Sequence, residues 1–284
     1  MFTRAIVRPP APNFAEGLTT AGLGAPDYEK ALAQHEAYCA ALERSGLTLI
    51  RLDRDPKFPD STFVEDTAIL TERGAILTRP GAPSRSGEVE NMRQVLIDYF
   101  PSLQTIQAPG TLDGGDVCEA GDHFFIGISE RTNESGAEQL AEMLKSFGYT
   151  SSFIDIRRFS ARQSAPGADR GPRAGSPRGV VDTTGSSAEI LHLKSGIAYL
   201  GDNRLAVTGA LAGREEFSAY ELVRVEPGEA YAANCLRVNE QVLVASSGAI
   251  FERQLRDLGY QTLLLEMTEF QKMDGGLSCL SLRF

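Results

Sequence analysis

Residues 116–129, DVCEAGDHFFIGIS, place two strand-like runs on either side of a short turn that contains Gly121. This pattern predicts a β-hairpin, because alternating or apolar runs pair across such turns. The next stretch, GAEQLAEMLKSFG (136–148), has apolar residues three and four positions apart, which is the spacing of a helix that buries one face. A strand-like run, TSSFIDI (150–156), follows it. These residues therefore predict a unit of hairpin, helix and strand.

The same unit recurs along the chain, which indicates a repeat architecture. Three further hairpin, helix and strand sets are expected at 66–79, 87–100 and 103–108; at 196–209, 213–220 and 221–226; and at 235–247, 249–259 and 260–266. The helix at 213–220 is short, and its apolar pattern is weak.

The two ends of the chain together supply a fifth unit. Residues 3–10 form half a hairpin, 27–46 its helix and 47–53 its strand, while SCLSLRF (278–284) supplies the missing half. Pairing of the terminal strands would close a ring in the manner of a propeller and bury both termini. We therefore predict an α/β fold, a five-bladed α/β propeller. An α/β sandwich of the same elements is the alternative.

One domain is expected over residues 1–284. The chain is long for an ordinary domain, and its 42% hydrophobic content supports a large core, but closed repeats reach this length as one unit. Residues 157–187 break the pattern, because they are rich in Gly, Pro, Ser and Arg. They predict a flexible insertion in the third unit, serving as a lid, as a basic contact surface or as a tolerated loop.

Composition excludes several classes of function. The formal charge of −10 argues against a nucleic-acid partner, whose phosphates need a cationic surface, and it is compatible with a small cationic ligand. We find no signal-peptide pattern and no run of eighteen apolar residues, which predicts a cytoplasmic protein that does not enter membranes. The four cysteines are scattered without CxxC spacing, so we expect reduced thiols.

Reactive side chains precede the predicted hairpins. Asp66 lies before the first, Asp113 and Asp116 before the second, His192 before the third and Cys279 before the closing one. In a five-fold ring these positions are quasi-equivalent, so we expect them to converge at one end of the central axis. A cysteine, a histidine and carboxylates brought together are the groups needed for nucleophilic catalysis by a thiolate.

Each of these residues also has a structural interpretation. A free cysteine is more often packing than chemistry, which suits Cys39, Cys118 and Cys235. The acids of TLDGGDV could serve only to form a turn. Zinc is a competing hypothesis, because Cys279, His192 and one acid could ligate it, but no short ligand spacing supports a metal site.

Taken together, these motifs resemble one enzyme family. FPDSTFVEDTAIL (58–70), TLDGGDV (111–117), LHLKS (191–195) and DGGLSCLSL (274–282) resemble the guanidine-modifying enzymes of the pentein fold. They are most similar to dimethylarginine dimethylaminohydrolase, also called dimethylargininase. The similarity spans nearly the whole chain outside the insertion, and the family's five-bladed propeller agrees with the repeat count.

The resemblance implies a reaction and three catalytic roles. Cys279 matches the family's nucleophile, His192 its general acid and base, and Asp113 the carboxylate that orients the histidine. The implied hydrolase cleaves the guanidinium C–N bond of Nω-methylated arginine through a thiouronium on the cysteine. Its products are citrulline and dimethylamine or methylamine, and no metal or organic cofactor is implied.

The resemblance also implies a set of substrate-binding residues. Asp66 matches the acid that binds the guanidinium, with Glu65 beside it, so that the choice between the two stays open. Leu18 matches a backbone contact and Asp60 a partner for the α-ammonium group. Arg85 and Arg131 match the pair that binds the α-carboxylate, a task suited to forked guanidinium donors.

Two alternatives come from relatives of the family. Arginine deiminases carry His-x-Asp, whereas this sequence has His192-Leu193-Lys194, and the missing acid favours a methylated substrate. A deiminase-like hydrolase of unmethylated arginine is thus the first alternative. A binding factor of the same fold without enzymatic activity is the second. The expected partner is a small-molecule substrate, with no nucleic acid and no membrane, bound by a monomer or a homodimer.

Overall fold

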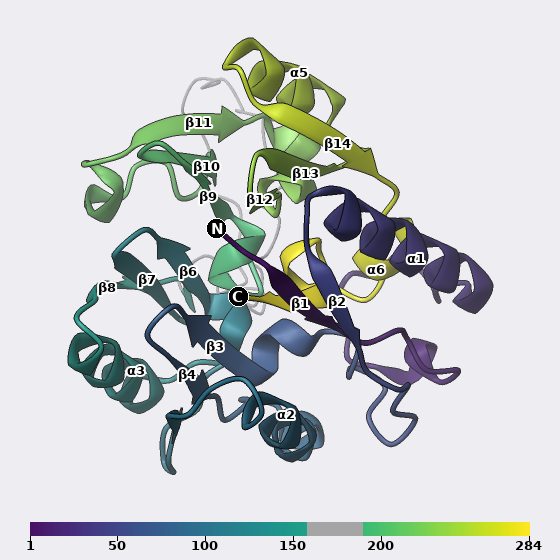
Figure 1. Ribbon diagram of the computed structural model, residues 1–284. Coiled ribbons are helices and arrows are strands. Elements are labelled where there is room, and N and C mark those ends of the chain that lie inside the picture. Colours follow the sequence, from purple (N-terminus) through teal and green to yellow (C-terminus); the bar gives the residue numbers. More distant parts are fainter. Residues whose placement is uncertain (158–189) are drawn as a thin grey trace, which may run out of the picture.

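The computed structural model describes residues 1–157 and 190–284. Within these residues the chain forms five three-stranded sheets arranged around a common axis, with the long helices on the outside (Figure 1). This is the predicted α/β architecture of five repeated units. The predicted insertion, 157–187, lies outside the described residues except for Arg157.

Each sheet has the same internal order. Its first two strands pair antiparallel, and the third strand pairs in parallel with the second. The sheets contain β3 (Ala68–Thr71), β4 (Gly74–Leu77) and β5 (Leu103–Thr105); β6 (Val117–Ala120), β7 (His123–Ile128) and β8 (Thr150–Asp155); β9 (Ile197–Gly201), β10 (Arg204–Thr208) and β11 (Glu221–Val225); β12 (Leu236–Val238), β13 (Gln241–Ala245) and β14 (Gln261–Leu265); and β15 (Ser281–Arg283), β1 (Arg4–Val7) and β2 (Thr48–Arg51).

Helices connect the second strand to the third in four of the five units. They are α1 (Tyr28–Arg44), α2 (Glu88–Leu96), α3 (Glu134–Ser146) and α5 (Ala249–Asp257). A further short helix, α6 (Thr268–Gln271), lies between β14 and the 3₁₀ turn Ser278–Leu280. In the third unit the expected helix at 213–220 is only a 3₁₀ turn, Glu215–Phe217. Phe217 is its one buried residue, too small an apolar face to hold a helix.

The ring closes through the two ends of the chain, as predicted. Strands β1 and β15 pair antiparallel, with Ile6 opposite Leu282. The backbone N–H groups of Thr3 and Arg4 both donate to the carbonyl oxygen of Phe284 at 2.9 Å. The last strand is therefore buried and ordered, and both termini lie near the axis (Figure 1).

The hydrophobic core is divided among the spaces between sheets and helices. One cluster joins Ile69 and Ile76 of one sheet to Val117 and Phe124 of the next, under the buried face of α3. Because each cluster bridges neighbouring units, the ring is held as one packed body. Short segments between strands can then be positioned accurately.

Five 3₁₀ turns lie just before the five inner strands. They span Val64–Thr67, Gly114–Asp116, Leu193–Ser195, Pro227–Ala233 and Ser278–Leu280, and they contact one another in series around the axis. The reactive side chains predicted from sequence lie in these turns or directly beside them. This arrangement is the reason that residues distant in the chain meet.

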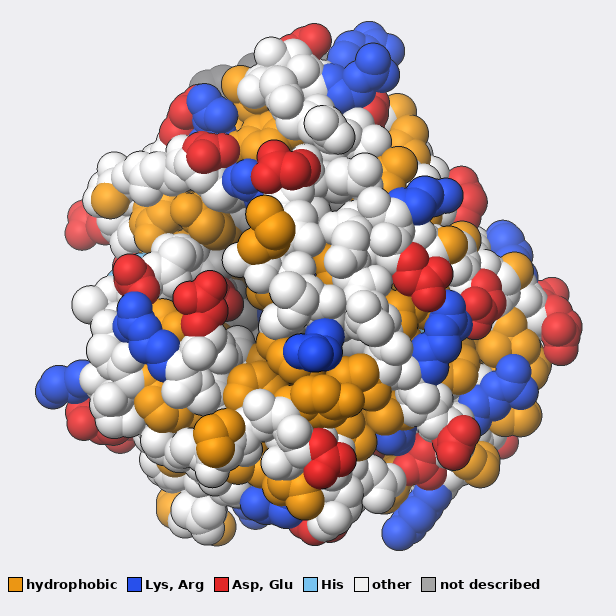
Figure 2. Space-filling model, in the orientation of Figure 1, with side chains coloured by type: hydrophobic (Ala, Val, Ile, Leu, Met, Phe, Trp, Pro, Cys, Tyr) orange, Lys and Arg blue, Asp and Glu red, His pale blue; other side chains and the backbone are white. Residues whose placement is uncertain are grey.

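The outer surface carries no continuous charged face on the side seen in Figure 2, where acidic and basic side chains alternate with uncharged ones. Among the described residues, no helix has the length and apolar content needed to cross a membrane.

Candidate active site

A pocket at one end of the axis collects the predicted site residues. All of them except Glu65 line it: Leu18, Asp60, Asp66, Arg85, Asp113, Arg131, His192 and Cys279. The free volume within it is about 40 Å³. The turns from four different units thus contribute to one site, as the repeat predicted.

His192 is held by Asp113. Its Nε2 lies 3.1 Å from Asp113 Oδ2, and the backbone N–H of Gly81 donates to Asp113 Oδ1 at 2.8 Å. Gly115 makes room for the imidazole, because a Cβ there would lie 2.8 Å from His192 Nδ1. The contact between carboxylate and imidazole that the resemblance implied is present in the structure.

Asp66 is a buried carboxylate with two fixed partners. Its Oδ1 accepts from the backbone N–H of Gly115 at 2.8 Å, and its Oδ2 accepts from Arg85 Nη1 at 2.5 Å. Burial favours the neutral acid, but the cations of Arg85 and His192 outweigh it and lower the pKa of Asp66 below its usual value. An ionised acid therefore faces the pocket.

Arg85 is itself almost fully engaged. Its Nε and Nη2 donate to Glu88 at 3.0 and 2.7 Å, and Nη2 also donates to the carbonyl of Phe63 at 2.9 Å. Together with the bond to Asp66, these contacts use four of the five N–H donors of a guanidinium. One donor on Nη1 is left without a partner among the described residues.

Both Cys279 and His192 are protonated in the free protein at neutral pH. Burial raises the pKa of the Cys279 thiol to about 12, and the carboxylates of Glu65 and Asp66 add to the effect. Burial lowers the pKa of His192, but Asp66, Asp113 and Asp116 outweigh it and raise the value to about 9. In the free protein at neutral pH, the sulfur is a thiol and the imidazole is a cation.

The other end of the pocket suits an amino acid. Asp60 is buried, and its two carboxylate oxygens accept from the backbone N–H of Leu18 at 3.0 and 3.2 Å. The guanidinium of Arg131 makes no hydrogen bond or ion pair with any described residue, although it lines the pocket. At this end of the pocket, a carboxylate group of a ligand would meet the unpaired guanidinium of Arg131, and an ammonium group would meet the carboxylate of Asp60.

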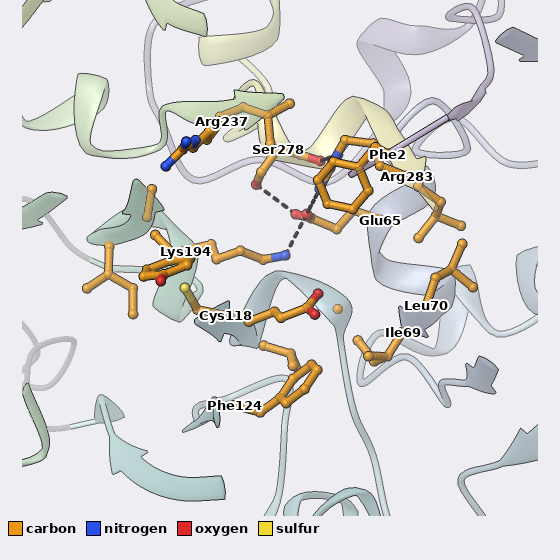
Figure 3. A pocket seen from close by; sticks show the side chains of 18 of the residues that line it. Phe2, Glu65, Ile69, Leu70, Cys118, Phe124, Lys194, Arg237, Ser278 and Arg283 are labelled. Atoms are coloured by element: carbon orange, nitrogen blue, oxygen red, sulfur yellow. Dashed lines mark hydrogen bonds and ion pairs between the residues drawn. The ribbon is translucent and has the colours of Figure 1, made fainter. Parts of the chain in front are cut away.

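Glu65 does not line this pocket. It lines a second, wider pocket of about 360 Å³ and lies between Lys194 and Ser278 (Figure 3). Lys194 Nζ donates to its Oε1 at 2.5 Å, and Ser278 Oγ donates to its Oε2 at 2.8 Å. Arg283 lies 3.5 Å from the same carboxylate. Of the two adjacent acids, only Asp66 lines the pocket that contains Cys279 and His192.

Asp116 supports the site from behind, a function that the sequence did not reveal. It is fully buried, and its Oδ1 accepts from the backbone N–H of Leu193 at 2.9 Å. Its Oδ2 accepts from Ser129 and Thr132 hydroxyls at 2.6 and 2.7 Å. Burial raises the pKa of Asp116 to about 6. It fixes the turn that follows His192, and the DGGD motif itself was the available signal.

One group of side chains has the spacing of a metal site. Ligand atoms of Asp66, Asp113 and His192 lie within 4.8 Å of one another. However, all four carboxylate oxygens of the two acids already accept hydrogen bonds, from Gly115, Arg85, Gly81 and His192. The cationic imidazole and guanidinium supply the charge that a metal ion would otherwise provide.

Comparison with known proteins gives full-length similarity. The chain is 38% identical over its full length to the full length of N(G),N(G)-dimethylarginine dimethylaminohydrolase from Pseudomonas aeruginosa. It is 31% identical over 99% of its length to 96% of the protein of that name from Streptomyces coelicolor. Residues 55–162 match the arginine deiminase family profile.

Solved structures agree with this similarity. The structure of a mutant of the P. aeruginosa enzyme complexed with citrulline aligns with this chain over the full length of both, with a TM-score of 0.87 at 38% identity. The N-terminal domain of ArgZ, a cyanobacterial arginine dihydrolase, shares the fold, with a TM-score of 0.80 over the whole chain and 97% of that domain, at 16% identity.

Proposed function

Because the chain belongs to the dimethylarginine dimethylaminohydrolase family, we propose that it hydrolyses Nω-methylated arginine to citrulline and dimethylamine or methylamine. The observation that carries this proposal is one pocket in which Cys279, the His192–Asp113 pair and the ionised Asp66 meet. A guanidinium is a planar cation, and Asp66 is the anion available to bind it beside the thiol. The alternative of a non-enzymatic binding factor gives these groups no shared purpose.

The charged groups of the pocket match the two ends of the substrate. Arg131 and the remaining N–H donor of Arg85 bind the α-carboxylate. Asp60 and the backbone of Leu18, which it already contacts, bind the α-ammonium group. Glu65 is not a direct ligand in this proposal, because its carboxylate serves Lys194 and Ser278 instead.

The substrate activates its own nucleophile. The thiol of Cys279 has a pKa of about 12 in the free protein, mainly because burial and two nearby carboxylates disfavour a second anion. A guanidinium bound at Asp66 neutralises that field, so the thiol loses its proton to solvent as the cation binds. The thiolate then attacks the guanidinium carbon, and a tetrahedral intermediate forms.

His192 transfers a proton in each half of the reaction. As an imidazolium with a pKa of about 9, it is protonated at neutral pH and gives its proton to the departing methylated nitrogen. The C–N bond breaks, and a thiouronium remains on Cys279. The neutral imidazole then takes a proton from water, which attacks the same carbon. Loss of the hydroxyl proton and cleavage of the C–S bond then release citrulline, and a proton returns the sulfur to its resting thiol form.

Hydrolysis of unmethylated arginine is the second candidate, favoured by the match of residues 55–162 to the arginine deiminase family. The position two residues after His192 argues against it. Lys194 is found there, and its ammonium group points to Glu65 in the other pocket. Asp66 is thus the acid positioned for the guanidinium, and the methylated side meets no carboxylate that would lose a partner.

One experiment separates the candidates. Citrulline release is measured side by side with asymmetric dimethylarginine, monomethylarginine and arginine at equal concentrations. We expect the methylated substrates to give the higher kcat/KM. Faster turnover of arginine would establish the deiminase instead, and binding without citrulline from any of the three would leave only the binding factor. We also propose that residues 1–284 form one domain. The protein acts in the cytoplasm as a monomer or a homodimer in this proposal.

A further inference from the structure

The fourth unit contributes a side chain at the position that carries a reactive residue in two other units of the ring. Asn234 lies two residues before the inner strand β12, as Asp66 lies two before β3 and Cys279 two before β15. The sequence predicts site residues in the other four units but none in this one. Asn234 is buried and lies at the end of the 3₁₀ turn Pro227–Ala233.

The amide of Asn234 joins the two halves of the catalytic pair. Its Oδ1 accepts from the backbone N–H of Ser278 at 2.9 Å. Its Nδ2 donates to the carbonyl of Lys194 at 3.0 Å and to Ser278 Oγ at 3.2 Å. Ser278 directly precedes Cys279, and Lys194 follows His192 by two residues. One side chain therefore ties the nucleophile's turn to the histidine's turn.

The same amide packs against the backbone that faces the sulfur. A Cβ at residue 276 would lie 2.6 Å from the side-chain carbon and oxygen of Asn234, so only glycine fits. The N–H of Gly276 donates to Cys279 Sγ at 3.4 Å. A second residue of this segment, Tyr231, donates from its hydroxyl to the carbonyl of Gly275 at 2.8 Å. The turn that presents the thiol is thus held from the fourth unit.

We propose that Asn234 is a positioning residue for the reaction, which sets the placement of the Cys279 sulfur relative to His192. This inference rests on the proposed function. The two groups come from different units of the ring, so their spacing depends on contacts between turns. A shift of about 1 Å between reacting groups lowers a rate by about 100-fold.

Asparagine is the residue type that this position requires. The amide offers an acceptor to Ser278 N–H and donors to the Lys194 carbonyl, and it does so within one planar group. Aspartate has the same shape but no donor when ionised, so it leaves the Lys194 carbonyl facing a carboxylate oxygen. Alanine leaves both buried backbone groups without their partner.

The test compares Asn234→Ala and Asn234→Asp with a matched control, Asn239→Gly. Asn239 also bridges by three amide hydrogen bonds, to Phe2 N, Phe2 O and Ser45 O, and its positive φ suits glycine. We expect both Asn234 variants to lose about 100-fold in kcat with KM within about three-fold. The control should keep both values near those of the wild type.

A second readout does not depend on turnover. Alkylation of Cys279 by 2-chloroacetamidine, a cation that mimics the guanidinium, should slow by a similar factor in both Asn234 variants and stay unchanged in Asn239→Gly. If Asn234→Ala fails to fold, the isosteric Asn234→Asp decides the question. Retention of more than a third of wild-type kcat and alkylation rate by a folded Asn234 variant would overturn the inference. A wild type that alkylates but makes no citrulline would instead refute the proposed function, and the alkylation rates would still judge Asn234.

Discussion

The charge on His192 depends on Asp113, and replacing Asp113 with asparagine tests this dependence. The substitution Asp113→Asn keeps an oxygen within reach of His192 Nε2, which lies 3.1 Å from Asp113 Oδ2. It removes a buried negative charge and leaves Asp66 and Asp116, the other acids that raise the pKa of His192. Because Asp113 Oδ1 also accepts from the Gly81 N–H, the amide NH2 group of asparagine removes that hydrogen bond as well as the charge.

The expected magnitude follows from the strength of that bond. A hydrogen bond to a charged group contributes about 1.5–3 kcal/mol, and about 1.4 kcal/mol corresponds to one pH unit in a pKa. We therefore expect the pKa of His192 to fall from about 9 to between about 7 and 8. The imidazolium form would then be partly lost near neutral pH. As the pH rises, the kcat of the variant should therefore begin to fall at a lower pH than the kcat of the wild type.

Proton NMR of the histidine ring protons measures the shift directly, because the chain has only three histidines. The other two titrate elsewhere: burial lowers the pKa of His35 to about 4 and also lowers that of His123. The matched control is Asp122→Asn, which removes an exposed acid paired with Arg73. An unchanged His192 titration in Asp113→Asn would refute the electrostatic account.

Four further variants test the proposed chemistry. Cys279→Ser should bind methylarginine in a calorimeter but release no citrulline, and measurable citrulline would contradict covalent catalysis. His192→Gly lacks both the proton donor for the departing nitrogen and the base for water, so it should release no citrulline, and release at the wild-type rate would count against proton transfer by His192. Glu65→Gln leaves the Lys194 ammonium without its buried counter-ion and should lower the free energy of unfolding by about 3 kcal/mol in urea. Its effect on KM should be smaller than that of Asp66→Asn, and the reverse order would show that Glu65 binds the guanidinium.

The repeat could be recognised from sequence because each element has its own local signal. Alternating runs around a Gly-containing turn marked the hairpin at 116–129, and the apolar spacing of 136–148 marked α3. The pairing of β1 with β15 could be predicted because each end of the chain carries only part of a unit. The two parts together make one complete unit, whose first two strands are β15 and β1. The weak pattern at 213–220 also reflected a real property, because that segment buries only Phe217 in its turn.

The different directions of the neighbouring side chains of Glu65 and Asp66 could not be predicted from the sequence. A 3₁₀ turn has about three residues per turn, so consecutive side chains point roughly a third of a circle apart. Within Val64–Thr67, this geometry directs Asp66 to the pocket with Cys279 and Glu65 to the pocket with Lys194. The sequence shows two adjacent acids and contains no sign of the direction that each one takes.

By itself, the sequence determined the five units, the closure of the ring and the kinds of side chain that meet at its axis, because these follow from periodicity and position within a repeat. Only the tertiary structure decided which polar groups pair: Arg85 with Asp66, Lys194 with Glu65, and Asn234 with both Ser278 and Lys194. These contacts join residues of different turns or units. Their geometry depends on the packing of the whole ring, which no local stretch of sequence encodes.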